Sequence, residues 1–248
     1  MSRLAIVSAM HEEMAALAPL VAGTQRLARA GREFLLGEIA GQPVILVRSG
    51  IGKVAAATTT AVLLDTFDAR AVLFTGVAGG LGAAVRVGDL VVGDELLQHD
   101  IDASPLFPRW EVPLTGRARF AADAGWSDRV AAACAGVCAA PPAGLAALGL
   151  GRPSVHRGLV ISGDRFVSTR AESDALRAAL PDALAVEMEG AAVAQVCHDF
   201  GRPLAVVRSI SDRADDTAHG DFGLFLTAVA AEYSRAVVLA TLAAAGAA

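Results

Sequence analysis

The chain has 248 residues, of which 54% are hydrophobic and 19% charged, and its formal net charge is −5. This composition excludes a disordered chain, and a chain of this length buries enough surface to fold without a disulfide staple. Nucleic-acid binding needs a basic face, so the negative charge argues against a nucleic-acid partner.

Short β-rich runs alternate with helical patterns along the chain. Strands are predicted at residues 4–8, 44–48, 71–75, 90–95, 159–162, 184–188 and 204–210. Helices are predicted at residues 11–21, 53–67, 171–180, 190–200 and 222–242. Residues 32–39, the turn at Gly41 and the strand 44–48 predict an antiparallel hairpin. The near-continuous apolar run within residues 203–208 (PLAVVR) is typical of a strand buried on both faces.

The alternation predicts an α/β fold: a three-layer sandwich with a central mixed, largely parallel sheet flanked by helices. The stretch 139–151, rich in Pro, Ala and Gly, is the best candidate for a linker. The strand after it is needed to complete the sheet, so we interpret this stretch as a surface loop. We expect a single domain over residues 1–248.

Three cysteines, Cys134, Cys138 and Cys197, are too few and odd in number for a disulfide framework. Reduced thiols are typical of the cytosol, where we expect this protein. The N-terminal residues 1–13 have only a short apolar run before an acidic pair, so no signal peptide is expected. The apolar run 236–248 is too short to span a bilayer and is interpreted as the end of a packed alanine-rich helix, so no membrane partner is expected.

Polar residues follow the predicted strands at their carboxyl ends. In α/β sheets these ends are where ligand groups gather. Six strand ends carry glycines together with the charged residues Glu13, Glu189, Arg208 and Asp212. This accumulation predicts a functional site at one rim of the sheet.

Two other patterns resemble a cofactor-binding or metal-binding motif, but each lacks a part that the motif requires. Residues 76–82 (GVAGGLG) resemble a dinucleotide fingerprint, but a strand pattern follows them where that fingerprint needs a helix. We interpret them as a tight turn with close backbone packing, or as a turn that cradles a ligand. Cys134 and Cys138 lack further zinc ligands at a suitable spacing and are interpreted as buried thiols. No metal or organic cofactor is expected.

Seven segments in chain order resemble one family. They are residues 9–14 (AMHEEM), 49–57 (SGIGKVAAA), 75–81 (TGVAGGL), 87–89 (VGD), 162–166 (SGDRF), 186–189 (VEME) and 210–212 (ISD). With this order and approximate spacing, the chain resembles the 5′-methylthioadenosine/S-adenosylhomocysteine nucleosidases of the nucleoside phosphorylase superfamily. The resemblance covers the chain from end to end.

The resemblance implies a role for each matching residue. Asp212 matches the general acid at purine N7, and Glu13 matches the base that activates the hydrolytic water. Glu189 matches the residue that holds the ribose hydroxyls. The other implied contacts are Ser211 supporting Asp212, Arg208 orienting the site, Met188 under the ribose, Phe166 stacked on adenine, Val167 pairing through its backbone with the base edge, and Met10, Ile51 and Phe222 against the sugar and its 5′ group.

The chemistry of an N-glycosidic bond suits these residue types. Breaking the bond leaves positive charge on the ribose and negative charge on the purine, so an acid near N7 and carboxylates near the ribose stabilise the transition state. One positioned base is then enough to direct water. Taken singly, Asp212 is equally typical of a helix N-cap and Glu13 of a carboxylate at a helix N-terminus. Their joint placement at strand ends favours the functional interpretation.

The sequence departs from the family pattern at two places. Val77 stands where some relatives have serine, which removes one hydrogen-bond partner for the water. Residues 99–115 are expected to form a lip over the 5′ substituent, but their aromatic positions do not match. The resemblance also implies a homodimer, and the lip offers an apolar contact patch of Leu106, Phe107, Pro108 and Trp110.

Three alternatives stay open at this point. A phosphorolytic purine nucleoside phosphorylase shares the fold, but phosphate would be repelled by Glu13. A nucleosidase for another 6-aminopurine nucleoside, such as aminodeoxyfutalosine, would differ only at the lip. A non-catalytic nucleoside-binding protein would be expected to lack either Asp212 or Glu13, and both are present.

Overall fold

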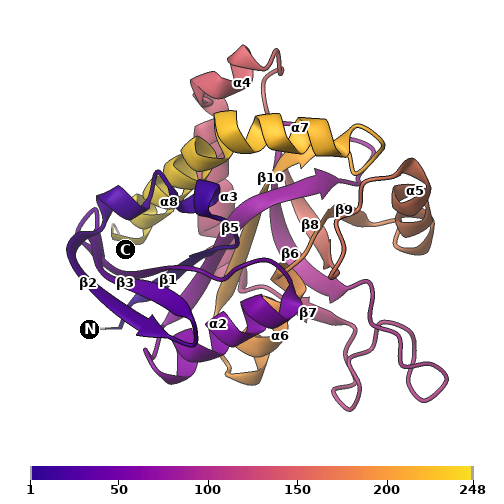
Figure 1. Ribbon diagram of the computed structural model, residues 1–248, viewed down its shortest axis with the longest axis horizontal. Helices are drawn as coiled ribbons and strands as arrows, with labels where there is room; N and C mark the ends of the chain where they lie inside the picture. The colour runs from indigo at the N-terminus through magenta and orange to yellow at the C-terminus, as the bar shows by residue number, and fades with distance from the viewer. Residues whose placement is uncertain (1, 247–248) are drawn as a thin grey trace.

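The computed structural model describes residues 2–246, with side chains as far as residue 244. A ten-stranded mixed sheet forms its centre (Figure 1). The strands are β1 (Leu4–Ser8), β2 (Ala22–Arg29), β3 (Arg32–Ile39), β4 (Gln42–Arg48), β5 (Ala71–Gly80), β6 (Leu90–Gln98), β7 (Arg119–Ala121), β8 (Val155–Ser162), β9 (Ala183–Glu187) and β10 (Leu204–Asp212). The α-helices are α1 (His11–Met14), α2 (Lys53–Asp65), α3 (Ala124–Ala139), α4 (Ala143–Ala147), α5 (Arg170–Ala179), α6 (Gly190–Asp199), α7 (Ala218–Phe225) and α8 (Ala231–Gly246).

The sheet has an open half and a closed half. In the open half, β1 lies parallel to β4, and β3 and β2 extend the edge in antiparallel order, which confirms the predicted hairpin. In the other half, β5 pairs with both β10 and β9, and β6 and β8 join those two strands. These five strands therefore close into a ring. Of the ten strand pairings among the described residues, five are parallel and five antiparallel.

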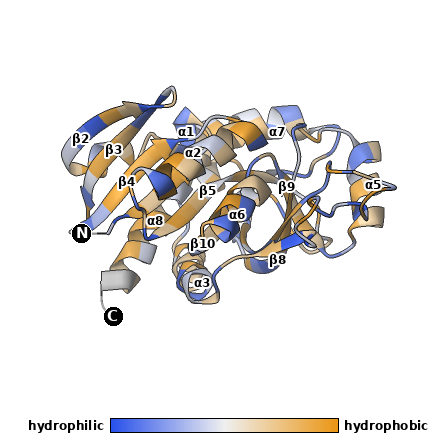
Figure 2. Ribbon diagram, turned by 90° about the horizontal axis from the view of Figure 1, so that it is seen from below, coloured by the Kyte–Doolittle hydropathy of each residue, from blue (hydrophilic) through white to orange (hydrophobic). Residues whose placement is uncertain are grey.

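Helices cover the sheet on both faces, which confirms the α/β layer arrangement. On β1, Ala5 and Val7 pack into a core with α2 and α6, whereas Leu4 and Ile6 pack into a second core with α3 and α8. This separation follows from the alternation of side chains along a strand. Figure 2 shows hydrophobic residues along the central strands and hydrophilic ones on the edge strand β2. One continuous sheet runs through the fold, as a single domain would require. The single-domain organisation of residues 1–248 stays a prediction.

Each predicted strand overlaps an observed strand, but several other expectations were wrong. The helix expected at residues 11–21 is the single turn α1 followed by a short 3₁₀ turn (Ala18–Leu20), because Pro19 lacks the N–H that a longer helix needs. Strand β2 was missed because its residues are almost all exposed and show no apolar alternation. The stretch 139–151 contains α4 in place of a continuous loop.

The glycine-rich residues 76–80 are the largest correction. They do not form a turn; they continue β5 to Gly80, where it pairs with β10 and β9. The tight-turn interpretation failed because glycine within a strand can also mark the close approach of other groups, and here the carboxyl groups of Glu13 and Asp212 approach Gly76 and Gly79.

The thiols Cys134, Cys138 and Cys197 are free and buried, as predicted.

The C-terminal helical stretch is longer than predicted: α7 continues through a π-helical turn (Leu226–Ala230) into α8. Its residues Ala218–Ala244 are long and apolar enough to cross a membrane by length and composition alone. Tyr233, Val237 and Leu242 are buried against the sheet and α3, so the stretch is a core helix of this fold, as the packed-helix interpretation of residues 236–248 required. Residues 247–248 lie outside the described part of the chain.

Candidate active site

A cavity of about 440 Å³ lies at the carboxyl ends of β1, β5, β9 and β10. Its walls come from the strand ends predicted to form a site and from α7. The lining residues are Ala9, Met10, Glu13, Ile51, Val77, Ala78, Gly79, Phe166, Val186, Glu187, Met188, Glu189, Ser211, Asp212, His219 and Phe222. A cavity of this size, mostly apolar with a few convergent polar groups, suits a small organic ligand.

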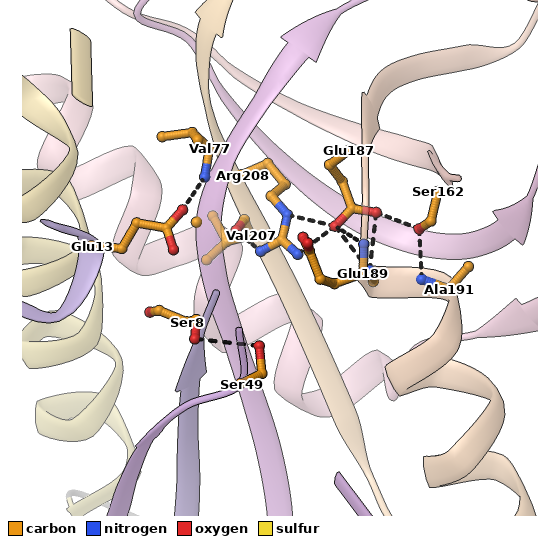
Figure 3. Close-up of polar contacts among 12 residues, drawn as sticks. Ser8, Glu13, Ser49, Val77, Ser162, Glu187, Glu189, Ala191, Val207 and Arg208 are labelled. Atoms are coloured by element: carbon orange, nitrogen blue, oxygen red, sulfur yellow. Dashed lines mark hydrogen bonds and ion pairs between the residues drawn. The ribbon is translucent and has the colours of Figure 1, made fainter. Parts of the chain in front are cut away.

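Glu13 projects from α1 toward β5. Its side chain is buried, and its two carboxylate oxygens accept hydrogen bonds from the backbone N–H of Met10 at 2.8 Å and of Val77 at 3.0 Å. Burial raises the pKa of Glu13, while these hydrogen bonds and the charge of Arg208 oppose the rise. Figure 3 shows the bond from Val77 to Glu13 beside β5. The carboxylate is therefore held in one orientation at the cavity wall.

Asp212 ends β10 on another wall of the same cavity. One of its oxygens accepts a hydrogen bond from the Ser211 hydroxyl and the other from the backbone N–H of Ala214, each at 2.8 Å. Burial raises the pKa of Asp212, and the negative charges of Asp221 and Asp215 add to the rise. This environment favours the protonated acid more than water does.

Glu189 and Glu187 lie side by side but have different partners (Figure 3). Glu187 forms an ion pair with Arg208 at 2.6 Å and accepts hydrogen bonds from Ser162 and from the backbone N–H of Gly190. From the described residues, Glu189 accepts one hydrogen bond, from the backbone N–H of Gly52 at 2.8 Å. Burial and the charge of Glu187 raise the pKa of Glu189 to about 8. Glu189 therefore keeps acceptor capacity toward the cavity, whereas Glu187 is largely occupied within the protein.

Aromatic rings form the remaining wall. Phe166 lies 5.4 Å from Phe222 in an edge-to-face arrangement and 5.0 Å from His219, measured between ring centroids. The face of an aromatic ring in such a wall is an apolar surface on which a planar base can stack.

The structure brings most predicted site residues together. Ten of the twelve line the cavity: Met10, Glu13, Ile51, Val77, Phe166, Met188, Glu189, Ser211, Asp212 and Phe222. Val167 packs into a neighbouring apolar core, and Arg208 is buried behind the wall with its guanidinium over the Phe74 ring. Sequence reasoning assigned no role to Glu187 or His219. Glu187 lies in the motif 186–189 and could have been considered, but nothing in the sequence placed His219.

Within one chain, the segment expected to form a lip does not reach this cavity, so its place over the 5′ substituent stays a prediction. No residue of 99–115 is among those that line the cavity. Figure 1 shows this segment, between β6 and β7, extending away from the body of the fold. Its base is tied down by Trp110, whose indole N–H donates to the carbonyl of His99 at 3.2 Å, and its outer part leaves Leu106 83% and Leu114 90% exposed.

Comparison with known proteins agrees with this fold and cavity. The sequence profile of the Phosphorylase superfamily matches residues 3–243. The chain is 36% identical over 240 residues to the 5′-methylthioadenosine/S-adenosylhomocysteine nucleosidase of Shewanella denitrificans, covering 97% of this chain and 98% of that protein.

Two solved structures have closely similar folds. The same type of nucleosidase from Neisseria meningitidis, in complex with methylthio-immucillin-A, is 35% identical and superimposes with a TM-score of 0.86, covering 98% of this chain and 100% of that chain. Futalosine hydrolase of Helicobacter pylori is 29% identical with a TM-score of 0.84, covering 98% of each chain.

The fold and the site thus define a protein of the phosphorylase superfamily. Its mixed sheet is flanked by helices, and its strand ends surround a cavity with buried carboxylates. The resemblance drawn from seven sequence segments is confirmed: the chain belongs to the Phosphorylase superfamily and, within it, to the family of 5′-methylthioadenosine/S-adenosylhomocysteine nucleosidases.

Proposed function

We propose that this protein hydrolyses the N-glycosidic bond of 5′-methylthioadenosine and S-adenosylhomocysteine, releasing adenine and a 5-thio-substituted ribose. The observation that carries the proposal is that two buried carboxyl groups, Glu13 and Asp212, line one cavity beside an aromatic wall. Each has its own backbone partners, and neither forms an ion pair with a residue that the structure describes. Two carboxyl groups with separate surroundings can take separate roles in one reaction.

Asp212 is the proton donor to the leaving purine. Its raised pKa favours the protonated form that this role needs. As the bond between C1′ and N9 breaks, negative charge accumulates on the purine, and a proton delivered to N7 neutralises it. Ser211 and the backbone N–H of Ala214 keep the carboxyl group in place.

Glu13 is the base for the water nucleophile. The oxygen of water bonds to C1′, and its proton passes to the carboxylate of Glu13. Val77 offers no side-chain hydroxyl to that water, but its backbone N–H fixes Glu13. The water is therefore positioned by Glu13, and residue 77 contributes only through the backbone hydrogen bond that holds Glu13.

Glu189 holds the ribose hydroxyls. It accepts only the Gly52 N–H within the described structure, so lone pairs remain for the substrate. Met188 lies beside it in the cavity wall, and Met10, Ile51 and Phe222 supply apolar contacts to the sugar and its 5′ group. Phe166 stacks on the adenine ring, Val167 offers its backbone to the base edge, and Arg208 orients the site indirectly by pairing with Glu187.

The charge of the cavity favours water over phosphate as the nucleophile. Among the described residues that line it, His219 is the one basic side chain. The buried Arg208 is already paired with Glu187 at 2.6 Å. A phosphate ion would lie beside the buried Glu13 with no cation to balance it, and such an arrangement is unfavourable.

The test is an assay of adenine release from methylthioadenosine in phosphate-free buffer and in buffer with added phosphate. We expect the same initial rate in both, and ribose that carries no phosphate as the product. Adenine release that depends strictly on phosphate would overturn hydrolysis in favour of phosphorolysis. Asp212→Asn serves as the matched inactive control.

A second candidate substrate is aminodeoxyfutalosine. Futalosine hydrolase of Helicobacter pylori shares this fold over 98% of the chain, which favours including that substrate. The same assay, run with both 5′ substituents, ranks them by kcat/KM. We expect methylthioadenosine to be preferred because Met10 and Ile51 present apolar contacts to the 5′ group.

We also infer that the protein acts as a homodimer. Leu106 and Leu114 on the 99–115 segment and Val54 on α2 are large apolar side chains that are exposed in one chain, and such side chains are typical of contact surfaces. Sedimentation of the purified chain should give twice the chain mass, and a monomer at micromolar concentration would contradict this.

We also propose a cytosolic location. The buried, free thiols support a reducing cytosolic setting.

A further inference from the structure

Residues 85–89, here called the VGD turn after their motif VGD (87–89), lead directly into β6. All five are described by the structure, and none of them lines the cavity. The proposed chemistry therefore gives this motif no direct role. The turn nevertheless adjoins the end of β10, the strand that carries Asp212.

The last residues of β10 are held by the VGD turn on the side that faces β6. The antiparallel pairing of β10 with β6 ends at Ser209, which lies opposite Leu90. Beyond that pair, the Gly88 N–H donates to the Ile210 carbonyl at 2.8 Å, and the Ile210 N–H donates to the Asp89 carbonyl at 2.9 Å. The turn thus fixes the backbone two residues before the proposed acid.

On the side that faces β5, the end of β10 is irregular. The register between β10 and β5 shifts between Ile210 and Asp212. Such an irregularity bends a strand and re-aims its side chains, so the direction of the Asp212 side chain depends on what holds the backbone around it. After Asp212, the guanidinium of Arg213 donates to the carbonyl of Val85, the first residue of the VGD turn. The turn therefore contacts the chain on both sides of Asp212.

Asp89 holds the VGD turn itself in place. Its buried carboxylate accepts hydrogen bonds from the backbone N–H of Arg86 at 2.9 Å and of Ser154 at 2.7 Å. It also accepts one from Nε2 of the His156 ring at 2.9 Å. The bond from Arg86 closes the turn, whereas those from Ser154 and His156 tie it to the beginning of β8. Asp89 therefore joins β8 to the turn that holds β10.

A second support for the VGD turn comes from the helix layer. Tyr233 on α8 is buried, and its hydroxyl donates to the Gly88 carbonyl at 2.6 Å. Gly88 has a φ of 95°, a backbone conformation that residues with a Cβ atom rarely adopt. The same residue therefore accepts from Tyr233 through its carbonyl and donates to Ile210 through its N–H. Asp89 and Tyr233 thus hold the turn from two separate elements.

We propose that Asp89 and Tyr233 are positioning residues, which act through the VGD turn to hold the carboxyl group of Asp212 against the leaving group. The inference rests on the proposed function, in which Asp212 delivers a proton to the purine. Proton transfer needs the donor and the acceptor within hydrogen-bond reach, so a small displacement of β10 slows bond cleavage although the acid is still present. Glu189 lies at the beginning of α6, away from this turn, so binding of the ribose should be retained.

The experiment measures kcat and KM for methylthioadenosine with Asp89→Asn and with Tyr233→Phe. Asparagine replaces one acceptor oxygen by N–H donors that face other donors, and phenylalanine removes only the hydroxyl. We expect kcat to fall about 10- to 100-fold in Asp89→Asn, the larger value being the effect of a shift of about 1 Å. Tyr233→Phe should lower kcat by a smaller factor because one hydrogen bond is lost, and KM should change little in either variant. Tyr233→Phe keeps the shape of the side chain and decides the question if Asp89→Asn does not fold.

A double-mutant cycle separates positioning from a general loosening of the structure. Each substitution is combined with Asp212→Asn. If Asp89 and Tyr233 act through Asp212, neither should lower kcat further once the acid has been removed. Two independent effects would multiply instead.

Matched controls remove the same chemical groups elsewhere. Asp94→Asn changes another aspartate next to the same turn, on β6, where the carboxylate pairs with the exposed Arg157 at 2.8 Å. Thr241→Val removes a buried hydroxyl from α8, which donates to the Val237 carbonyl at 2.8 Å and not to the VGD turn. Both controls should leave kcat unchanged.

Two results would overturn the inference. One is a loss of kcat in Asp89→Asn or Tyr233→Phe that multiplies with the loss in Asp212→Asn, and the other is an unchanged kcat in the folded variants. Failure of the proposed function is distinguishable from these results. The wild type would then release no adenine from methylthioadenosine, or Asp212→Asn alone would be fully active, and the positioning role would fall with the acid.

Discussion

Gly76 on β5 leaves the space that the carboxylate of Glu13 occupies. A methyl group built on Gly76 would lie 2.8 Å from Glu13 Oε1, closer than a methyl carbon approaches an oxygen atom. Three residues further along the strand, a methyl group on Gly79 would lie 2.9 Å from an oxygen of Asp212. The glycine-rich end of β5 thus gives each carboxyl group its place at the cavity.

Gly76→Ala should therefore displace Glu13. We expect kcat to fall by roughly 10²-fold, since a shift of about 1 Å in a reacting group has that effect. Overpacking should also lower the free energy of unfolding by about 1–3 kcal/mol. Steady-state kinetics and urea denaturation measure the two effects.

Gly136→Ala is the control for that substitution. Gly136 lies on the exposed face of α3 with nothing within 4 Å of an added methyl group. This change should leave kcat intact and stabilise the helix by about 0.5–1 kcal/mol. Full activity of Gly76→Ala would show that the position of Glu13 is not critical.

Asp212→Asn should keep the fold and lower kcat by roughly 10²–10⁴-fold, the range for general acid–base residues. In the wild type, activity should fall as pH rises through the pKa of Asp212 and as pH falls through that of Glu13, because one must be protonated and the other ionised. The variant should lose the alkaline limb of this profile. A rate profile measured over pH 4–10 tests this, and an unchanged alkaline limb would exclude Asp212 as the acid.

The same variant should change the pH dependence of stability. Because burial raises the pKa of Asp212 in the folded state, its stabilising contribution is complete below the unfolded pKa of about 3.9 and is lost as pH rises through the folded pKa. Asparagine cannot ionise. The melting temperature of Asp212→Asn relative to that of the wild type should therefore rise between pH 4 and pH 8.

Asp215→Asn is a control for which the pH dependence of stability, relative to the wild type, should have the opposite sign. Hydrogen bonds from Thr217 lower the pKa of Asp215, so its ionised form stabilises the fold above the unfolded pKa, and that contribution is lost as pH falls through the folded pKa. This variant should be less stable than the wild type at pH 8, with the difference vanishing in acid. Parallel pH trends in the two variants would contradict the assigned environments.

Glu187→Gln should destabilise the protein by about 3–5 kcal/mol, because it removes the ion-pair partner of the buried Arg208 guanidinium. Combining it with Arg208→Met removes the unpaired charge as well. The double variant should recover part of the lost stability in chemical denaturation. A double variant that is no more stable than Glu187→Gln would show that the ion pair is not the cause.

Much of the fold could be predicted from the sequence. Strands such as 4–8 and 204–210 begin with unbroken apolar runs, as expected of strands buried on both faces, and the direction of each side chain follows from backbone geometry within a few residues. Edge strand β2 was missed because its residues are almost all exposed and therefore show no apolar run.

The sequence by itself determined the family and the two acidic residues of the site, because Glu13 and Asp212 stand in short motifs at the ends of recognisable strands. Only the tertiary structure decided what surrounds them. The pairing of β5 with β10, the ion pair of Glu187 with Arg208 and the outward course of residues 99–115 all join or separate segments that are distant in the chain. Such contacts depend on how side chains fill the space between packed layers, and no local pattern of residues records that arrangement.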